Sequence, residues 1–274
     1  MSVNFLFWNL GGRALEAVVG RLAADHSADV VMLAECPDGA DVTAALNAEA
    51  GGPSYREPPS LNPRFRILTR WRDERLPPIG DDLSGRMTFR RVRPENGLDV
   101  LLAVVHFHSR RQWDRDDQAA EVSNLAAEIR RMEDLYGHRR TVVVGDFNMD
   151  PFDKGMVAHT GIHAAMTRDI CEAETRTVAE QEYPFFYNPM WGYFGDCNDG
   201  PPGTFYLRSG KAVKQFWHMF DQVLLRPSLM RRLIDLRIPV RAGPYALATK
   251  TGLPGGPVGS DHFPLLFSLD LNAP

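Results

Sequence analysis

The sequence predicts an α/β fold, and three observations carry this prediction. An apolar strand, an amphipathic helix and a second apolar strand follow one another within residues 3–34, which is the pattern of a βαβ unit. A second segment of helical periodicity, residues 122–132, leads directly into an apolar strand at residues 141–145. Further short apolar segments recur as far as residue 269. Alternation of this kind predicts buried strands covered by helices.

The first unit begins with a strand at residues 3–7, which a Gly-Gly turn at residues 11 and 12 separates from the helix. Apolar residues at helical spacing between positions 15 and 23 predict that helix. The second strand, residues 30–34, ends at Glu35, so a carboxylate follows the C-terminal end of a buried strand. Sites of α/β folds are usually found at such strand ends.

The middle of the chain predicts two more strands, a loop, a helix and another strand. Residues 66–69 and 101–107 are strand-like, and a Pro-rich loop is expected between residues 75 and 80. The amphipathic segment at residues 122–132 predicts a helix, and residues 141–145 predict the next buried strand.

Residues 150–215 are irregular and rich in Pro, Gly and aromatic side chains, which predicts an insertion over the functional edge of the sheets. Strand signals resume at residues 220–225, 236–240 and 263–269. No internal repeat, low-complexity tract or linker divides the sequence, so we expect residues 1–274 to form one domain.

Composition excludes several classes of protein. The chain has 274 residues, 44% of them hydrophobic, and a net charge of −4, which argues against a strongly basic nucleic-acid-coating protein and a disordered acidic tail. Cys36, Cys171 and Cys197 lack the spacing of a disulfide framework or zinc knuckle and are compatible with a reducing compartment. No apolar run approaches 18 residues, and the first strand leaves no room for a signal peptide, so we expect a soluble, cytoplasmic protein without membrane insertion.

The net charge hides an uneven distribution of arginine. The chain has 27 Arg and 4 Lys, and residues 56–115 hold 13 Arg against 8 acidic residues, a local net charge of +5. Codon bias accounts for the ratio of Arg to Lys but not for the clustering. Because the planar guanidinium suits phosphate, the cluster favours a phosphate-bearing substrate.

Polar residues stand at the ends of the apolar strands, where burial is costly unless they bind metal, phosphate or a polar partner. Taken singly, each has a simpler interpretation: a cap or surface group for Glu35, a closed turn for Asn9, a hydrogen-bonded core residue for His106. The Gly145–Asn148 turn is a stronger signal, because i and i+2 residues point to the same side. Together they predict one shared cleft. The residues are Asn9, Glu35, His106, Asp146, Asn148, Asp221, Asp261 and His262.

Six segments around these residues run along the chain in a fixed order: Phe7-Trp8-Asn9, Leu33-Ala34-Glu35, Val105-His106-Phe107, Val144-Gly145-Asp146-Phe147-Asn148, Phe220-Asp221-Gln222-Val223-Leu224 and Ser260-Asp261-His262. This series resembles the endonuclease/exonuclease/phosphatase superfamily, which includes pancreatic-type deoxyribonucleases, abasic-site endonucleases, neutral sphingomyelinases and inositol polyphosphate 5-phosphatases. The resemblance implies a four-layer α/β sandwich, two packed mixed β-sheets flanked by helices, with a divalent-metal phosphoesterase site at one edge.

The resemblance also implies roles for these residues. Glu35 would be the principal ligand of Mg²⁺ or Mn²⁺, with Asn9 and Asp261 completing or flanking the metal shell, and oxygen ligands suit such hard cations. Asp146 would activate or position the attacking water, and Asn148 would hold that water or a phosphate oxygen. His262, oriented by Asp221, would act as base or as charged donor. His106 would donate a hydrogen bond to the phosphate.

Three positions depart from the family pattern. Gly11 stands where abasic endonucleases often carry an acidic residue, which weakens a second metal near Asn9. His108 lies two residues after His106 and is an alternative phosphate contact; we favour His106 because the large apolar Phe107 follows it. His218 stands where relatives often have Asn, and its role is open.

We expect the protein to be a metal-dependent nuclease that cuts DNA or RNA. The sequence does not indicate whether it acts as an endonuclease or an exonuclease. The arginines would line the cleft, Arg66, Arg70 and Arg110 among them, with His108 beside them. Trp191 in the aromatic segment would stack a base, although a small aromatic core under a loop is the simpler explanation of that segment. The arginines expected to line the cleft are Arg64, Arg66, Arg70, Arg72, Arg86, Arg90, Arg91, Arg93, Arg110, Arg111 and Arg115.

Two other functions remain open. A phosphatase or phosphodiesterase for a small-molecule, inositol or lipid phosphoester fits the modest total charge, although no basic amphipathic helix suggests a lipid surface. A scaffold that kept the fold but lost activity is disfavoured, because every ionisable residue of the predicted cleft is present. No obligate protein partner is inferable from the sequence.

Overall fold

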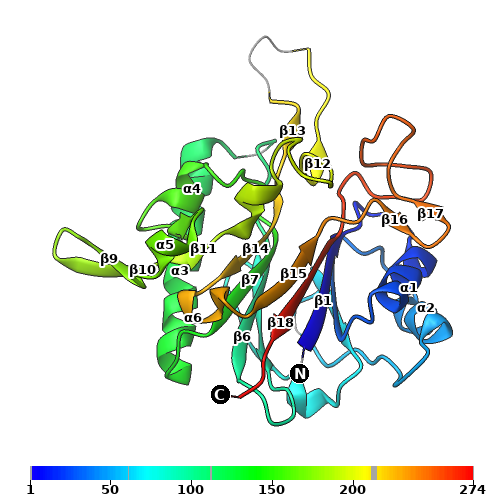
Figure 1. Cartoon of the computed structure of the whole chain (residues 1–274), viewed down its shortest axis with the longest axis horizontal. Helices are drawn as coiled ribbons and strands as arrows, with labels where there is room; N and C mark the ends of the chain where they lie inside the picture. The colour runs from blue at the N-terminus through cyan, green and yellow to red at the C-terminus, as the bar shows by residue number, and fades with distance from the viewer. Residues whose placement is uncertain (1, 61, 112, 211–214, 274) are drawn as a thin grey trace.

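The computed structural model of the chain describes residues 2–60, 62–111, 113–210 and 215–273. Two large mixed β-sheets pack face to face, and helices cover the outer face of each (Figure 1). Helices α1 (Glu16–Asp25) and α2 (Val42–Glu49) lie on one side, and the long α3 (Arg115–Tyr136) lies on the other. The expected four-layer α/β sandwich is confirmed.

The first sheet has five strands in the order β15-β18-β1-β2-β3. β1 pairs in parallel with β2 and antiparallel with β18, so the first and last strands of the chain are neighbours at its centre. The strands are β1 (Ser2–Asn9), β2 (Val30–Ala34), β3 (Phe65–Thr69), β15 (Leu233–Arg237) and β18 (Leu265–Asp270).

The second sheet has seven strands in the order β4-β5-β6-β7-β14-β11-β8. β6 and β7 are parallel, and β14 runs antiparallel to β7. The strands are β4 (Pro78–Asp81), β5 (Met87–Val92), β6 (Val100–His106), β7 (Thr141–Asp146), β8 (Ala164–Ala165), β11 (Phe186–Tyr187) and β14 (Asp221–Leu225).

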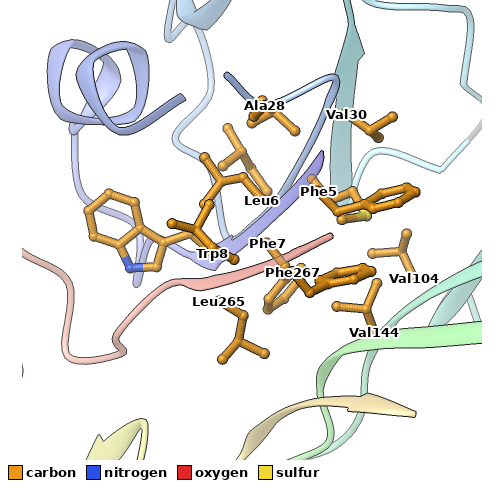
Figure 2. Close-up of a cluster of buried hydrophobic side chains, with 14 of the residues drawn as sticks. Phe5, Leu6, Phe7, Trp8, Ala28, Val30, Val104, Val144, Leu265 and Phe267 are labelled. Carbon is orange, nitrogen blue, oxygen red and sulfur yellow. The ribbon is translucent and has the colours of Figure 1, made fainter. Parts of the chain in front are cut away.

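Period-two alternation divides the second sheet between two cores. Val104 and Val144 face the first sheet and pack in the core that contains Phe5 and Phe267, whose rings stack 4.7 Å apart (Figure 2). Their neighbours Val105 and Val143 face the opposite way, into the core under α3. Burial on both faces fixes the strand register, since a shift of one residue would exchange the two faces.

The remaining elements connect or decorate these layers. In the described part of the chain, three two-stranded sheets lie outside the main ones, formed by β9 with β10, β12 with β13 and β16 with β17. Their bounds are β9 (Thr175–Val178), β10 (Gln181–Pro184), β12 (Phe205–Tyr206), β13 (Trp217–His218), β16 (Arg241–Ala242) and β17 (Tyr245–Ala246). The short helices are η1 (Asp73–Arg75), α4 (Lys154–Val157), α5 (Arg168–Cys171), η2 (Pro189–Tyr193) and α6 (Pro227–Met230).

Two sequence expectations change in the structure. The Pro-rich loop expected at residues 75–80 contains the edge strand β4, in which Pro78 needs no ladder donor because one side of the strand is unpaired. The irregular segment 150–215 is divided: β8 and β11 extend the second sheet away from the functional edge, and only the part near β12 reaches the top edge in Figure 1.

Two further properties bear on the sequence expectations. Cys36, Cys171 and Cys197 are all free thiols. Among the described residues, no helix is both long enough and apolar enough to cross a membrane.

Candidate active site

The polar strand ends meet at one edge of the sandwich, at the top of Figure 1. β1, β2, β6 and β7 run toward this edge, and β14 and β18 start from it. Within the second sheet, the register places His106, Asp146 and Asp221 in one row across β6, β7 and β14. The first sheet contributes Asn9 at the end of β1 and Glu35 directly after β2.

Asp146 is the centre of this cluster. Its Oδ2 accepts hydrogen bonds from Nδ2 of Asn9 at 3.0 Å and from Nδ2 of Asn148 at 3.3 Å. The same oxygen lies 3.8 Å from Nε2 of His106 and 3.9 Å from Nε2 of His262. Two sheets and four side chains therefore converge on one carboxylate oxygen.

Glu35 is an accessible group of the cluster, with 44% of its side chain exposed. Its Oε1 accepts from Nε2 of His106 at 3.2 Å and from Nδ2 of Asn9 at 3.5 Å. The hydrogen bond from His106 is the main cause of a lowered pKa for the Glu35 carboxyl, and it outweighs the opposing effect of burial. Glu35 is therefore anionic and open to solvent at neutral pH.

His262 is buried and held from three sides. Its Nδ1 lies 2.8 Å from Oδ2 of Asp221, its ring packs 4.8 Å from the ring of Phe205, and its carbonyl accepts from Nε1 of Trp8 at 2.9 Å. Burial alone would lower the pKa of His262, but the carboxylates of Asp221 and Asp146 outweigh it and raise that pKa to about 10. The imidazole is therefore a cation at neutral pH, with Nε2 turned toward Asp146.

Two residues of the site other than glycine have a positive φ. Glu35 has φ +48°, in the left-handed region that glutamate rarely adopts and that is strained for it, whereas Asn148 has φ +49°, which asparagine adopts more readily. Asn148 is held there by its N–H, which donates to Oδ1 of Asp146 at 2.8 Å, and by Nδ2, which donates to the carbonyl of Phe107 at 2.9 Å. Strain such as that of Glu35 is typical of sites in which a side chain must be aimed.

Asp261 lies beside Gly11, and this contact explains the glycine. A Cβ at position 11 would stand 2.6 Å from Oδ1 of Asp261, and Gly11 also has φ +58°. The same carboxylate oxygen accepts from the hydroxyl of Ser260 at 3.2 Å. The glycine at position 11 thus lets the backbone approach Asp261 closely, and position 11 supplies no carboxylate itself.

The oxygen donors of the site suit a hard divalent cation, but the amide oxygen of Asn9 does not face the carboxylates. Glu35 and Asp146 offer carboxylate oxygens, and the buried Oδ1 of Asp221 has no hydrogen-bond partner among the described residues. Asp146, Asp221 and His262 also form a group whose ligand atoms lie within 4.8 Å of one another.

Asn9 turns its nitrogen toward the carboxylates, because its oxygen accepts from the N–H of Gly11 at 3.0 Å. Ligation by Asn9 therefore requires that its amide turn over.

The predicted substrate arginines lie in different surroundings. Arg66 is near the site edge, but its guanidinium is held by Glu57, with Nη2 2.6 Å from a carboxylate oxygen. Arg70 lies at the opposite end of the first sheet, where its N–H donates to the carbonyl of Asp29 at the start of β2. The structure does not bring Arg70 to the cluster.

The other predicted substrate residues also lie outside the cluster. Arg110 pairs with Asp153, and His108 turns to the outer side of the second sheet, where Nδ1 is 2.6 Å from Oε1 of Glu121. Trp191 lies in η2 with its ring 6.1 Å from that of Phe152. Of the two neighbouring histidines, His106 is therefore the one that the structure places at the site.

Arg86 belongs to the arginine cluster at residues 56–115, but no sequence pattern indicated a specific role for it. Its Nη1 donates to the carbonyl of His106 at 3.4 Å, and no ion pair joins it to a carboxylate among the described residues. Burial is the main cause of a lowered pKa for this guanidinium. Its position just before β5, beside the end of β6, could not be read from the sequence, because β5 itself gave no clear strand signal.

A second buried pair of histidine and aspartate, His218 with Asp150, was not predicted from the sequence. Nδ1 of His218 lies 2.8 Å from Oδ2 of Asp150, and the other oxygen of Asp150 accepts from the N–H of Met219 at 3.0 Å. His218 stacks on Phe220 with ring centroids 4.5 Å apart. The only sequence signal was a histidine two residues before the predicted strand that begins at residue 220.

A mixed α/β sandwich that gathers oxygen donors and imidazoles at one exposed edge is suited to hydrolysis of a phosphoester. Residues 6–262 match the model of the Endonuclease/Exonuclease/phosphatase family, and the chain belongs to this family. Its members are divalent-metal-dependent enzymes that hydrolyse phosphoester bonds. The chain is therefore a hydrolase of this kind.

Solved structures with the same fold are distant in sequence. ANGEL2, a 2′,3′-cyclic phosphatase, superposes with a TM-score of 0.62 at 15% identity over 100% of this chain and 96% of that chain. D. rerio TDP2, complexed with single-strand DNA product, gives 0.57 at 16% identity over 98% and 99%. The endonuclease domain of TRAS1, a telomere-specific non-LTR retrotransposon, gives 0.56 at 13% identity over 100% of both chains. No curated protein sequence matches the chain.

Proposed function

We propose that this protein is a nuclease that hydrolyses phosphodiester bonds of DNA or RNA with Mg²⁺ or Mn²⁺. The observation that carries the proposal is the convergence of two imidazoles on Asp146: Nε2 of His106 and Nε2 of His262 lie 3.8 and 3.9 Å from its Oδ2. A carboxylate between two imidazoles can orient a water on one side of a phosphate while the imidazoles donate to its oxygens.

Glu35 is the proposed principal ligand of the cation, with Asp261 and, after its amide turns, Asn9 beside it. The accessibility of Glu35 and its lowered pKa support this role, because the ligand must be ionised and reachable. When bound, the cation supplies Lewis-acid stabilisation of charge on the phosphate and on the leaving oxygen.

Asp146 and Asn148 are the proposed holders of the attacking water. The two hydrogen bonds from Asn9 and Asn148 to Oδ2 of Asp146 fix the plane of the carboxylate. Asp146 would then accept a proton from the water as it attacks phosphorus. Asn148, held by its hydrogen bonds to Oδ1 of Asp146 and to the carbonyl of Phe107, would keep the water or a phosphate oxygen in place.

His262 is the proposed charged donor to the phosphate, and the structure favours this role over that of a base. The neighbouring carboxylates of Asp221 and Asp146 raise the pKa of His262 and so favour the protonated ring, which donates from Nε2 rather than accepting a proton. Asp221 holds the proton on the ring by its contact with Nδ1. His106 would donate a second hydrogen bond from Nε2, which now points to Glu35.

Three observations support a nucleic acid as the substrate. Arg86 presents a guanidinium without a carboxylate partner beside the carbonyl of His106. Tyr206 and Phe216 stack across the β12–β13 pair, which bridges to His262 through Phe205. Among the solved structures of the same fold, D. rerio TDP2 is complexed with single-strand DNA product, and the TRAS1 domain is an endonuclease domain.

A second candidate is a phosphatase or phosphodiesterase for a small phosphoester. Arg66 and Arg110, which were expected to follow a nucleic-acid backbone, are already neutralised by Glu57 and Asp153. Fewer free guanidinium groups favour a smaller substrate. The fold likeness to ANGEL2, a 2′,3′-cyclic phosphatase, is compatible with this candidate.

A substrate panel separates the two candidates. Purified protein would be incubated with Mg²⁺, Mn²⁺ or EDTA and supplied with plasmid, single-stranded DNA, RNA, bis-p-nitrophenyl phosphate and inositol phosphates. We expect metal-dependent cleavage of at least one nucleic acid at a kcat/KM well above that for the small diester. Cleavage of only the small substrates would overturn the nuclease proposal, and lack of any cleavage with either metal would contradict the assigned chemistry.

A further inference from the structure

One arginine stands opposite Glu35 at the edge of the first sheet. The last register pair between β2 and β3 joins Ala34 to Phe65. Glu35 directly follows this pair on β2, and Arg64 directly precedes it on β3. The two residues therefore leave neighbouring strands at the same functional edge. Arg64 is exposed, and among the described residues no carboxylate is paired with its guanidinium.

A second arginine stands opposite His106 in the second sheet. The N–H of His106 donates to the carbonyl of Arg86 at 2.9 Å, one step beyond the register pair of Met87 with Val105. Opposed residues of an antiparallel pair point to the same face, and successive residues alternate. Because Met87 faces the core under α3, Arg86 and His106 lie on the other face, toward the first sheet.

The buried amide of Asn62 joins the two segments that carry these arginines. Its Oδ1 accepts from the N–H of Arg64 at 3.1 Å, and its Nδ2 donates to the carbonyl of Gly85 at 3.3 Å. A Cβ on Gly85 would lie 3.8 Å from Nε of Arg64, so the side chain of Arg64 passes close to the residue before Arg86. One hydrogen-bonded side chain thus brings Arg64 and Arg86, the arginine pair, together from different sheets.

The two guanidinium groups are close enough to act on each other. Burial is the largest cause of the lowered pKa of Arg86, and the positive charge of Arg64 is the next. An anion placed between two like charges offsets their repulsion. The carboxylates near Arg86 contact other groups: Glu35 contacts His106, Asp82 accepts from the N–H of Ser84, and Glu121 contacts His108.

The arginine pair lies on the far side of His106 from Asp146. The N–H of His106 is directed to β5, and Nη1 of Arg86 lies 3.4 Å from the carbonyl of the same residue. β6 separates β5 from β7, which places these two strands about 10 Å apart at the usual strand spacing. A phosphate held at Asp146 by the two imidazoles therefore leaves the arginine pair free for another phosphate of the same strand.

We propose that the arginine pair binds the phosphate next to the scissile one in a nucleic-acid strand. This inference rests on the proposed nuclease function and assigns a second phosphate subsite to it. Guanidinium groups suit the role because they donate to phosphate oxygens from a rigid planar fork. A backbone contact of this kind positions the strand without reading its bases, so the preference that it creates is for charge and not for sequence.

Cleavage of an end-labelled single-stranded oligonucleotide that carries one neutral methylphosphonate linkage tests the proposal. The rate at each linkage beside the neutral one is compared with the rate at the same linkage of the unmodified strand, and a distant linkage serves as the internal reference. For the wild-type protein, we expect cleavage on one side of the neutral linkage to be slower by about fivefold or more, because a charge-assisted contact is lost. In protein with both Arg64→Ala and Arg86→Ala, the two rates should agree within about twofold.

Arg93→Ala is the matched control, because it removes an exposed arginine that follows the opposite end of β5, and it should keep the wild-type ratio. Equal rates beside charged and neutral linkages in the wild-type protein, or the wild-type ratio in the double variant, would overturn the arginine pair as a phosphate subsite. Lack of cleavage of the unmodified strand with Mg²⁺ and Mn²⁺ would instead overturn the proposed nuclease function, and this inference with it.

Thermal unfolding shows whether each variant is folded. If the double variant is not, Arg64→Ala alone decides, because it changes an exposed side chain without an ion pair among the described residues. It should lower the wild-type ratio by about twofold or more. An unchanged ratio in this variant would overturn the proposal.

Discussion

The molecule contains two buried histidine–aspartate pairs of the same dimensions that differ in what the second ring nitrogen faces. In both pairs, His262 with Asp221 and His218 with Asp150, Nδ1 lies 2.8 Å from a carboxylate oxygen. Nε2 of His262 points toward Asp146 at the open edge of the sheets, 3.9 Å away. Nε2 of His218 is buried and has no partner among the described residues.

This difference separates a chemical role from a structural one. The charged ring of His262, held by Asp221, can donate a hydrogen bond to a phosphate. Its Nε2 is suited to this because it points to the cluster around Asp146. The pair of His218 and Asp150 joins β13 to the loop after β7, and its ring packs on Phe220. The contact between imidazole and carboxylate is therefore not itself a sign of catalysis.

The largest effect is expected from removal of His262 or its neighbour Asp146. His262→Ala and Asp146→Ala should each lower kcat for phosphodiester cleavage by roughly 10² or more, because a positioned donor or water-holding group is lost. Steady-state assays with saturating Mn²⁺ measure this. Rates near that of the wild type would show that the chemistry is performed elsewhere.

A smaller loss is expected when the orienting carboxylate is neutralised. Asp221→Asn keeps the shape of the pair but lowers the pKa of His262, so the charged imidazole becomes scarcer as pH rises. We expect kcat to fall about tenfold at pH 7 and further at pH 9. A pH–rate profile parallel to that of the wild-type enzyme would argue that Asp221 does not keep the proton on His262.

Variants of two arginines test which guanidinium group contacts the substrate at the active-site edge. Arg86→Ala removes a guanidinium that has no carboxylate partner, and we expect KM for an oligonucleotide to rise roughly threefold to tenfold. Arg66→Ala serves as the matched control, because Glu57 already neutralises that side chain. A larger effect of Arg66→Ala than of Arg86→Ala would reverse our assignment of the substrate-facing cation.

The raised pKa of His262 predicts how stability depends on pH in metal-free protein. The folded state holds the proton up to about pH 10, whereas the unfolded state releases it near pH 6.5. This contribution to stability is fully present below pH 6.5 and is lost as pH rises toward 10. Urea unfolding in EDTA should show that decline in the wild-type protein, and His262→Gln should show less of it.

The smallest effect on activity is expected from the second pair. His218→Asn should leave kcat within about threefold of the wild-type value but lower the free energy of unfolding by about 1–3 kcal/mol, because the buried Asp150 loses a donor. Parallel activity and urea-unfolding measurements check both parts. A loss of kcat as large as that of His262→Ala would make the two pairs functionally equivalent.

The edge at which the polar strand ends meet was easier to predict from the sequence than some individual elements of the fold. Asn9, Glu35 and Asp146 stand at the ends of strands that burial makes unmistakable, so the edge at which they meet followed from the apolar pattern. Helix α2 and strand β5 were not predicted. α2 has only eight residues, and β5 carries Arg90 and Arg91, which interrupt the apolar alternation.

The arginine cluster shows why the rest of the site could not be predicted. Arg90 is fully buried, and its Nη1 donates to the carbonyl of Pro59. Arg66 pairs with Glu57, nine residues away, and Arg110 pairs with Asp153, 43 residues away. Charge along the sequence records how many guanidinium groups are present, whereas tertiary contacts decide which of them are free for a substrate.

Cleavage of an end-labelled single-stranded oligonucleotide by wild-type and His262→Ala proteins tests the central proposal most directly, with Mg²⁺, Mn²⁺ or EDTA in the buffer. We expect cleavage by the wild-type protein with a divalent metal, none with EDTA, and a rate roughly 10² lower or more for His262→Ala. Cleavage that persists in EDTA or is unchanged in His262→Ala would contradict it.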